Sequence, residues 1–172
     1  EQVGGESLIA NIMADGMLAA TKQMGSVAAF INQGGVRAGL EAGKITYGQA
    51  IAVMPFNNTL TVLDVTGAEL LAAIKQGLGT GGQLTPSAGT SYRATGGDVQ
   101  VTIAGQPLDP AKTYRITLLG FTANGGDSLF AFRDAKGRRI DTGLVDIDAF
   151  VEYLKANSPL NPKPEGRVSV SR

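Results

Sequence analysis

Histidine and cysteine are both absent from this chain of 172 residues. Without histidine, a Ser-His-Asp triad, a Cys-His pair and a His-ligated zinc site are all excluded. Without cysteine, neither a disulfide nor a reactive thiolate can form, and this absence says little about the cellular compartment. The chemistry that remains is that of carboxylates, lysines and oxygen-ligated metals.

An excess of either charge is also missing, because 15 basic residues balance 15 acidic ones. The chain therefore has no basic field of the kind that attracts nucleic acid. No apolar run reaches the roughly 18 residues of a membrane span, and no segment has the pattern of a signal peptide. A hydrophobic content of 43% and a charged content of 17% are typical of a globular protein. We expect one domain, residues 1–172, and the irregular start suggests a piece of something longer.

Glycine, in contrast, is abundant, with 24 residues, and the most informative stretch begins with a glycine pair. Residues 32–37 read Asn-Gln-Gly-Gly-Val-Arg and follow an apolar run, so the backbone can turn sharply there and approach a ligand closely. Residues 55–58 read Pro-Phe-Asn-Asn, on backbone that the proline restricts. A cation, an aromatic face and two amides on constrained backbone suit the recognition of a flat anionic molecule.

Hydrophobic periodicity and turn residues predict a mixture of helices and strands. Helices are predicted over residues 6–21, 47–53, 146–157 and from 66 to the glycines at 77–82. Strands are predicted over residues 26–31, 59–65, 92–95, 99–103, 114–119 and 166–170. Asn11 and Asp15 are expected on a solvated or capping face of the first helix. The order has no strict βαβ rhythm, which favours the α+β class.

Two short motifs suggest other functions and are rejected. Residues 77–82 fit G-x-G-x-x-G, but they follow a helix, whereas a dinucleotide fingerprint follows a strand and opens a helix. We predict a helix end and a loop there. Residues 126–129 spell Gly-Asp-Ser-Leu, the signature of a serine esterase family. A serine nucleophile needs an activating base, and the chain has no histidine to provide it.

Several ordered motifs resemble the C-terminal domain of the 5'-nucleotidase and UDP-sugar hydrolase family. They are residues 32–37, residues 42–47 (Ala-Gly-Lys-Ile-Thr-Tyr), residues 55–58 and residues 121–127 (Phe-Thr-Ala-Asn-Gly-Gly-Asp). The resemblance covers nearly the whole chain. It implies a layered α/β sandwich with mixed sheets packed between helix layers. It also implies a location in the periplasm, outside the cell or at the cell surface.

The resemblance further implies a binding site for a nucleotide or nucleoside. Its residues would be Asn32, Arg37, Phe56, Asn58, Gly82, Phe121 and Asp127. The two phenylalanines match those that sandwich the base, and Asp127 matches the carboxylate that accepts hydrogen bonds from the ribose hydroxyls. Arg37 would bind phosphate, Asn32 and Asn58 match positions that hydrogen-bond the base, and Gly82 is the nearest match to a glycine that lines the base pocket. The family's further phosphate-binding arginines are absent from this chain.

Each of these residues also has a structural interpretation. The phenylalanines could belong to the core, Asp127 could merely shape a glycine turn, and Arg37 could pair with Glu41 four residues later. Both asparagines could serve as turn residues.

The family hydrolyses its substrates on a separate N-terminal metallophosphoesterase domain, which carries a divalent metal pair. None of that domain's motifs occurs in this chain, so we expect no catalytic residue, no metal and no cofactor here. The predicted function is a nucleotide-recognition domain of a 5'-nucleotidase-like phosphohydrolase, inactive alone, with its own N-terminal domain as partner. The alternative is a non-catalytic binding or surface-interaction module with the same fold.

Overall fold

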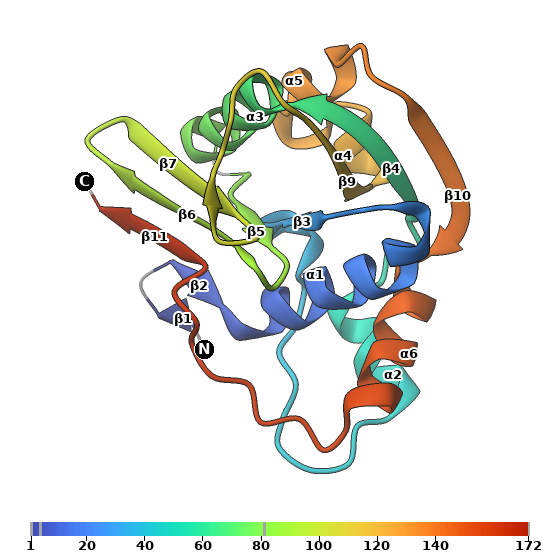
Figure 1. The fold of residues 1–172 in the computed structure, drawn as a ribbon. Coiled ribbons are helices and arrows are strands. Elements are labelled where there is room, and N and C mark those ends of the chain that lie inside the picture. Colours follow the sequence, from blue (N-terminus) through green and yellow to red (C-terminus); the bar gives the residue numbers. More distant parts are fainter. Residues whose placement is uncertain (1, 4, 81, 172) are drawn as a thin grey trace.

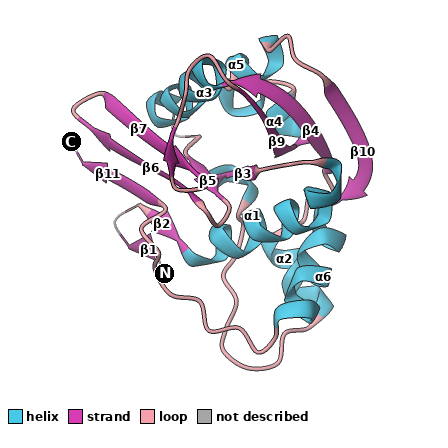
Figure 2. Ribbon diagram, in the orientation of Figure 1, coloured by secondary structure: helices cyan, strands magenta, loops and turns pink. Residues whose placement is uncertain are grey.

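The computed structural model of the protein describes residues 2–3, 5–80 and 82–171, which form two main sheets and their covering helices (Figures 1 and 2). The helices are α1 (Leu8–Thr21), α2 (Tyr47–Val53), α3 (Gly67–Thr80), α4 (Gly120–Ala123), α5 (Phe130–Asp134) and α6 (Asp146–Asn157). The strands are β1 (Gln2–Val3), β2 (Glu6–Ser7), β3 (Ala28–Asn32), β4 (Thr59–Thr66), β5 (Leu84–Pro86), β6 (Thr90–Thr95), β7 (Asp98–Ile103), β8 (Gln106–Pro107), β9 (Thr113–Leu119), β10 (Arg139–Val145) and β11 (Val168–Ser171). The predicted α+β class with mixed sheets is confirmed.

The larger sheet has five strands in the order β10-β4-β9-β3-β5. Strands β3 and β9 run parallel, while β4 is antiparallel to β9 and β5 is antiparallel to β3. Strand β10 forms the edge of the sheet opposite β5 and pairs antiparallel with β4. The ends of β3 and β9 therefore lie beside the starts of β4 and β5, and we call this end of the sheet the site end.

Helices cover both faces of the five-stranded sheet, so its inner strand β3 is buried on each side. Phe30 of β3 packs in a core with residues of α3 and α5, whereas its neighbour Ile31 packs with residues of α1, α2 and α6. In Figure 1, α3 and α5 lie on one side of β3, and α1 and α6 lie on the other. All five residues of β3 are buried, as expected for a strand enclosed between two layers. Truncation of a side chain such as Phe30 to alanine typically costs about 3–5 kcal/mol.

The second sheet has the order β11-β6-β7-β8 and lies beside the first (Figure 1). Strand β11 pairs parallel with β6, which brings the last described residues next to the middle of the chain. Tyr92 on β6 donates a hydrogen bond from Oη to the Leu84 carbonyl on β5, over 2.7 Å. Burial raises the pKa of Tyr92, so the phenol stays protonated and the bond between the two sheets is kept.

Helix starts follow from local hydrogen bonding. Thr46 and Gln49 form a reciprocal capping box at the start of α2. Thr66 and Glu69 bond in the same pattern at the start of α3, where the Glu69 carboxylate accepts from the Thr66 backbone N–H over 2.8 Å. The predicted bounds of α2 and α6 are confirmed.

Helix α3 ends at Thr80, inside the predicted segment of residues 77–82, after it has run through Gly77 and Gly79. Gly77 serves close packing instead of termination. A Cβ atom at Gly77 would lie 2.6 Å from the carbonyl oxygen of Gly82. The glycine therefore lets the chain that returns after α3 lie directly against the helix.

The predicted solvated face of α1 is wrong. Asn11 is buried and donates a hydrogen bond from Nδ2 to the Glu6 carboxylate over 2.6 Å. Asp15 accepts from both terminal nitrogens of Arg167, at 2.7 and 2.9 Å. The segment that leads into β11 covers this face of α1. The sequence of α1 alone could not predict this contact, because Arg167 lies far along the chain. No helix in the described part of the chain is long and apolar enough to cross a membrane.

Candidate functional site

The topology brings the predicted site residues together at the site end of the five-stranded sheet. Asn32 ends β3, and Phe121 comes two residues after β9, which is parallel to β3. Phe56 and Asn58 precede β4, whose Leu60 pairs with Leu119 at the end of β9. Gly82 precedes β5, whose Leu84 pairs with Asn32. Four segments that lie far apart in the sequence thus meet at one place.

Asn32 and Asp127 are in direct contact. Nδ2 of Asn32 donates to Oδ2 of Asp127 over 2.5 Å. Oδ1 of the same amide accepts from the Thr122 hydroxyl over 3.4 Å, so both ends of the Asn32 side chain are engaged. Asn32 is only 2% exposed, whereas Asp127 is half-buried. Within the part of the chain that the structure describes, Oδ1 of Asp127 has no hydrogen-bond partner.

The backbone at Asp127 is in the left-handed region, with φ 54° and ψ 28°, and Ser128 follows with φ 62°. This conformation costs about 1–2 kcal/mol for a residue with a side chain. Two neighbours hold the turn from outside it. The Thr80 hydroxyl donates to the Asp127 carbonyl over 3.1 Å and shares its proton with the Gln76 carbonyl at 3.0 Å, and a Cβ atom at Gly82 would lie 2.8 Å from the Asp127 Cβ. Gly82 thus lies at the predicted site, where it leaves room for Asp127.

Phe56 and Phe121 are exposed by 53% and 50%, which is unusual for phenylalanine. The interpretation of either residue as part of the core is therefore wrong. The Phe121 ring packs over Gly126, where an added Cβ atom would lie 2.4 Å from the ring. That contact places the ring beside the turn that carries Asp127.

Arg37 lies over the Phe56 ring, with 5.7 Å between Cζ and the ring centroid. Among the described residues it forms no ion pair with Glu41, so the predicted alternative of an i,i+4 pair is wrong. The arginine is exposed, and its backbone N–H donates to the Val53 carbonyl over 3.0 Å. A guanidinium group thereby lies next to an exposed aromatic ring, and its Nη1 atom donates to the Gly34 carbonyl over 3.5 Å.

Asn58 is turned toward another partner. Its backbone N–H and its Nδ2 both donate to Oδ2 of Asp146, at 3.1 and 3.0 Å. Burial raises the pKa of Asp146, and the hydrogen bonds from Asn58 and from the Ile147 backbone counteract that rise. A contact between Asn58 and a ligand would therefore have to use its Oδ1 atom.

Several supporting residues escaped the sequence reasoning. Thr122 lies within the second aromatic motif and could have been found there, and Thr80 lies just before the glycines that follow α3. Gly34 lies close to the hydrogen-bonded side chains of Asn32 and Asp127, because a Cβ atom at Gly34 would lie 3.4 Å from Oδ2 of Asp127. Arg139 of β10 donates to the carbonyls of Ala123 and Phe132, at 2.9 and 3.0 Å, and no local signal in the sequence points to it.

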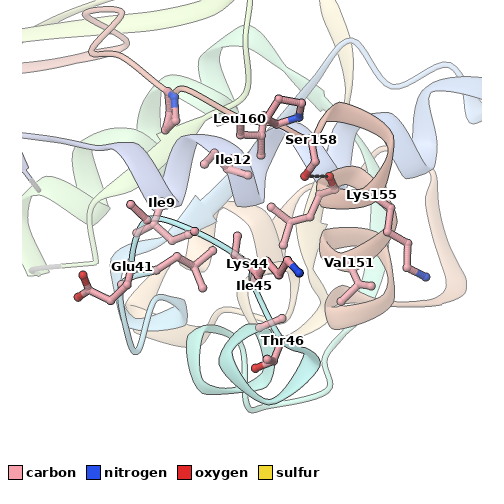
Figure 3. A pocket seen from close by; sticks show the side chains of 18 of the residues that line it. Ile9, Ile12, Glu41, Lys44, Ile45, Thr46, Val151, Lys155, Ser158 and Leu160 are labelled. Atoms are coloured by element: carbon pink, nitrogen blue, oxygen red, sulfur yellow. Dashed lines mark hydrogen bonds between the residues drawn. The ribbon is translucent and has the colours of Figure 1, made fainter.

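A large cavity lies elsewhere, between α1, the loop before α2, and α6. It has a volume of about 1230 Å³, and none of the predicted site residues lines it. Figure 3 shows Ile9 and Ile12 of α1, Ile45 of the loop before α2, and Val151 and Lys155 of α6 around this cavity. In the described residues, no group of three or more Asp, Glu, His or Cys side chains could hold a metal ion.

Residues 1–134 match the sequence model of a family described as "5'-nucleotidase, C-terminal domain". The chain belongs to this family. This 5'-nucleotidase C-terminal domain is 37% identical, over 95% of its length, to the trifunctional nucleotide phosphoesterase protein YfkN of Bacillus subtilis. It is 36% identical, over 90% of its length, to the protein UshA of Escherichia coli.

The fold of the domain also matches solved structures. A 5'-nucleotidase precursor from Thermus thermophilus has a TM-score of 0.89 and 36% identity over 96% of this chain. The match takes up only part of each relative: 12% of YfkN, 30% of UshA and 35% of the Thermus chain. The domain thus spans about a third or less of the length of these proteins.

Proposed function

We propose that this domain recognises the base and ribose of a nucleotide whose phosphate ester is hydrolysed by a separate N-terminal domain. The observation that carries the proposal is the set of side chains at the site end of the five-stranded sheet. Two phenylalanines are exposed there, one beneath an arginine, and a carboxylate is held in a strained turn nearby. Chains in the same family carry names of nucleotidases and nucleotide phosphoesterases.

The two exposed rings suit a nucleobase. Stacking on an aromatic side chain contributes about 1–3 kcal/mol per base and tolerates different bases, because every base has a π-face. Phe56 and Phe121 together could supply about 2–6 kcal/mol before the cost of immobilising the ligand, which is at least several kcal/mol. We therefore expect millimolar or weaker affinity for a nucleoside.

Asp127 and Arg37 suit the rest of the nucleotide. The Oδ1 atom of Asp127 can accept hydrogen bonds from ribose hydroxyls, and a charged acceptor strengthens such bonds. The guanidinium of Arg37 can bind phosphate oxygens in a bidentate manner. Its contact with Phe56 restricts the side chain in advance of binding, which lowers the entropy lost when a ligand arrives.

Hydrolysis itself is assigned to the N-terminal metallophosphoesterase domain, where a pair of divalent metal ions would activate water at the phosphate. Such an enzyme would act in the periplasm or outside the cell. A module that binds ligands or surfaces without turnover would share this fold and lack the metal motifs. The sequence encoded ahead of residue 1 distinguishes the two, because only the hydrolase carries Asp-x-His and Asn-His-Glu motifs there.

The proposal is tested by following the NMR spectrum of the labelled 172-residue chain during titration with adenosine, uridine or ribose. Because stacking dominates, adenosine and uridine should differ from each other less than either differs from ribose. The shifts should centre on residues at the site end of the sheet. Shifts centred on the large cavity near α6 would contradict the assignment.

Replacement of Phe121 provides the sharper test. Phe121→Ala removes one stacking face, so adenosine binding should weaken about five- to a hundredfold while the protein stays folded. Tyr47→Ala is the matched control, because Tyr47 is 56% exposed on α2 and is not one of the predicted site residues. Equal adenosine binding by wild type and Phe121→Ala would rule out the proposed stacking site.

A further inference from the structure

Asn32 is a residue that the family resemblance assigns to contact with the base, but its surroundings in this chain suggest a different role. The side chain is 2% exposed, and both ends of its amide are already bonded. The Nδ2 end faces Asp127 and the Oδ1 end faces Thr122. A ligand at the surface would have to displace one of these partners to reach the amide.

The partner of Asn32 is a residue whose backbone needs support. Asp127 and Ser128 are both in the left-handed region, and neither is glycine. Such strain persists only when the surrounding structure fixes it. The turn is held by Asn32 from β3, by the Thr80 hydroxyl at the end of α3, and by the space that Gly82 leaves beside the Asp127 Cβ.

The hydrogen bond from Asn32 engages only one of the two carboxylate oxygens of Asp127. Oδ2 is occupied by Nδ2 of Asn32 at 2.5 Å, and this bond orients the carboxylate plane. In the described part of the chain, Oδ1 is left without a partner, on a residue that is half-buried. The oxygen that can meet a ligand is thereby presented in a fixed direction.

We infer that Asn32 is a positioning residue, which governs recognition of the ribose hydroxyls by fixing Asp127 and does not contact the base. The inference rests on the proposed nucleotide site and deepens it. It predicts that the effect of Asn32 on affinity depends on the hydroxyls of the ligand and is independent of the base.

The test compares adenosine with 2',3'-dideoxyadenosine, which keeps the base and lacks both ring hydroxyls. NMR titrations of the wild type should show that loss of the hydroxyls weakens binding about tenfold, because hydrogen bonds to a charged carboxylate are lost. In Asn32→Ala and in the similarly shaped Asn32→Asp, adenosine should bind about as weakly as the dideoxy analogue. The tenfold difference between the two ligands should therefore shrink to about twofold or less.

A direct base contact gives the opposite pattern. In that case the Asn32 variants weaken both ligands equally, the tenfold difference remains, and the inference is overturned. Wild-type protein that binds neither ligand would instead overturn the proposed function itself. The two failures are therefore distinguishable.

Thr80→Val provides a second variant that leaves Asn32 in place. It removes the hydroxyl that donates to the Asp127 carbonyl and keeps the side-chain shape. The difference between adenosine and the dideoxy analogue should shrink in this variant as well, though less than in the Asn32 variants. This comparison decides the matter if both Asn32 variants fail to fold, and an unchanged difference in Thr80→Val would then count against the inference.

Discussion

Asn58 joins the segment before β4 to the start of α6. Replacement of Asn58 should therefore affect the stability of the fold. Its two nitrogen atoms donate to one oxygen of the buried Asp146. Asn58→Ala removes one of these donors and leaves a buried carboxylate less well satisfied. We expect a loss of about 1–3 kcal/mol in the free energy of unfolding, with little change in adenosine binding.

Urea unfolding at pH 7 measures the first quantity and NMR titration the second. Asn161→Ala serves as the control, because Asn161 is exposed. A variant of normal stability that no longer binds adenosine would show that Asn58 contacts the base instead.

At the scale of single residues, the sequence indicates which side chains are exposed better than it indicates their hydrogen-bond partners. Phe56 follows a proline and Phe121 precedes a glycine pair, and both rings are exposed as those neighbours suggest. The direction of the Asn32 side chain could not be predicted, because it depends on a turn 95 residues away. The same limit applies to Asp15, whose partner Arg167 lies near the other end of the chain.

At the scale of elements, the short helix α4 depends on β10, whose Arg139 lies 16 residues after Ala123. A helix of four residues is too short to be stable alone. Arg139 of β10 donates to the Ala123 carbonyl, to the Asn124 side chain and to the Phe132 carbonyl, so one guanidinium ties the ends of α4 and α5 together.

Arg139→Met keeps most of the side-chain stem and removes these donors. We expect a loss of about 1–2 kcal/mol in the free energy of unfolding, since the group is partly exposed, together with faster amide exchange around Phe121. Hydrogen exchange followed by NMR measures the second effect. The neighbouring Arg138→Met is the control, and similar exchange in both variants would show that Arg139 does not hold the turn.

The elements predicted correctly are those with strong local signals. Helices α2 and α6 have caps or apolar spacing that mark their ends, and β4 and β9 are rich in β-branched residues. Among the strands that were missed, β5 and β10 are the outer strands of the five-stranded sheet. Strand β5 has three residues and ends in Pro86, and β10 contains Gly143, so neither has the pattern of a buried central strand.

At the scale of the whole molecule, Glu6 ties the beginning of the chain to its end. The carboxylate is 2% exposed and accepts hydrogen bonds from Asn11 and from the backbone N–H groups of Glu165 and Gly166. Burial acts to raise the pKa of Glu6, but these hydrogen bonds outweigh it and hold the pKa below the ordinary value of 4.5.

A carboxyl group whose pKa is lowered by folding stabilises the folded state at pH values above its ordinary pKa. This stabilisation is lost as the pH falls through the folded-state pKa. Glu6→Gln should therefore lower the free energy of unfolding by about 1–3 kcal/mol at pH 7. The difference from wild type should narrow below about pH 4.5, where protonated Glu6 resembles glutamine. Urea midpoints measured from pH 7 to about pH 3.5 check this, with the exposed Glu41→Gln as control. A difference that stays constant with pH would contradict the assignment.

The contact between Asn32 and Asp127 also has a consequence for the order of events during synthesis. The site joins residues that the ribosome produces far apart in time, since the two partners are 95 positions from each other. A nascent chain that has released β3, α2 and α3 holds Phe56 and Gly82 but lacks the carboxylate and the second ring. At the proposed site a nucleotide can therefore bind only after Asp127 has been made, and it cannot guide the folding of the earlier segments.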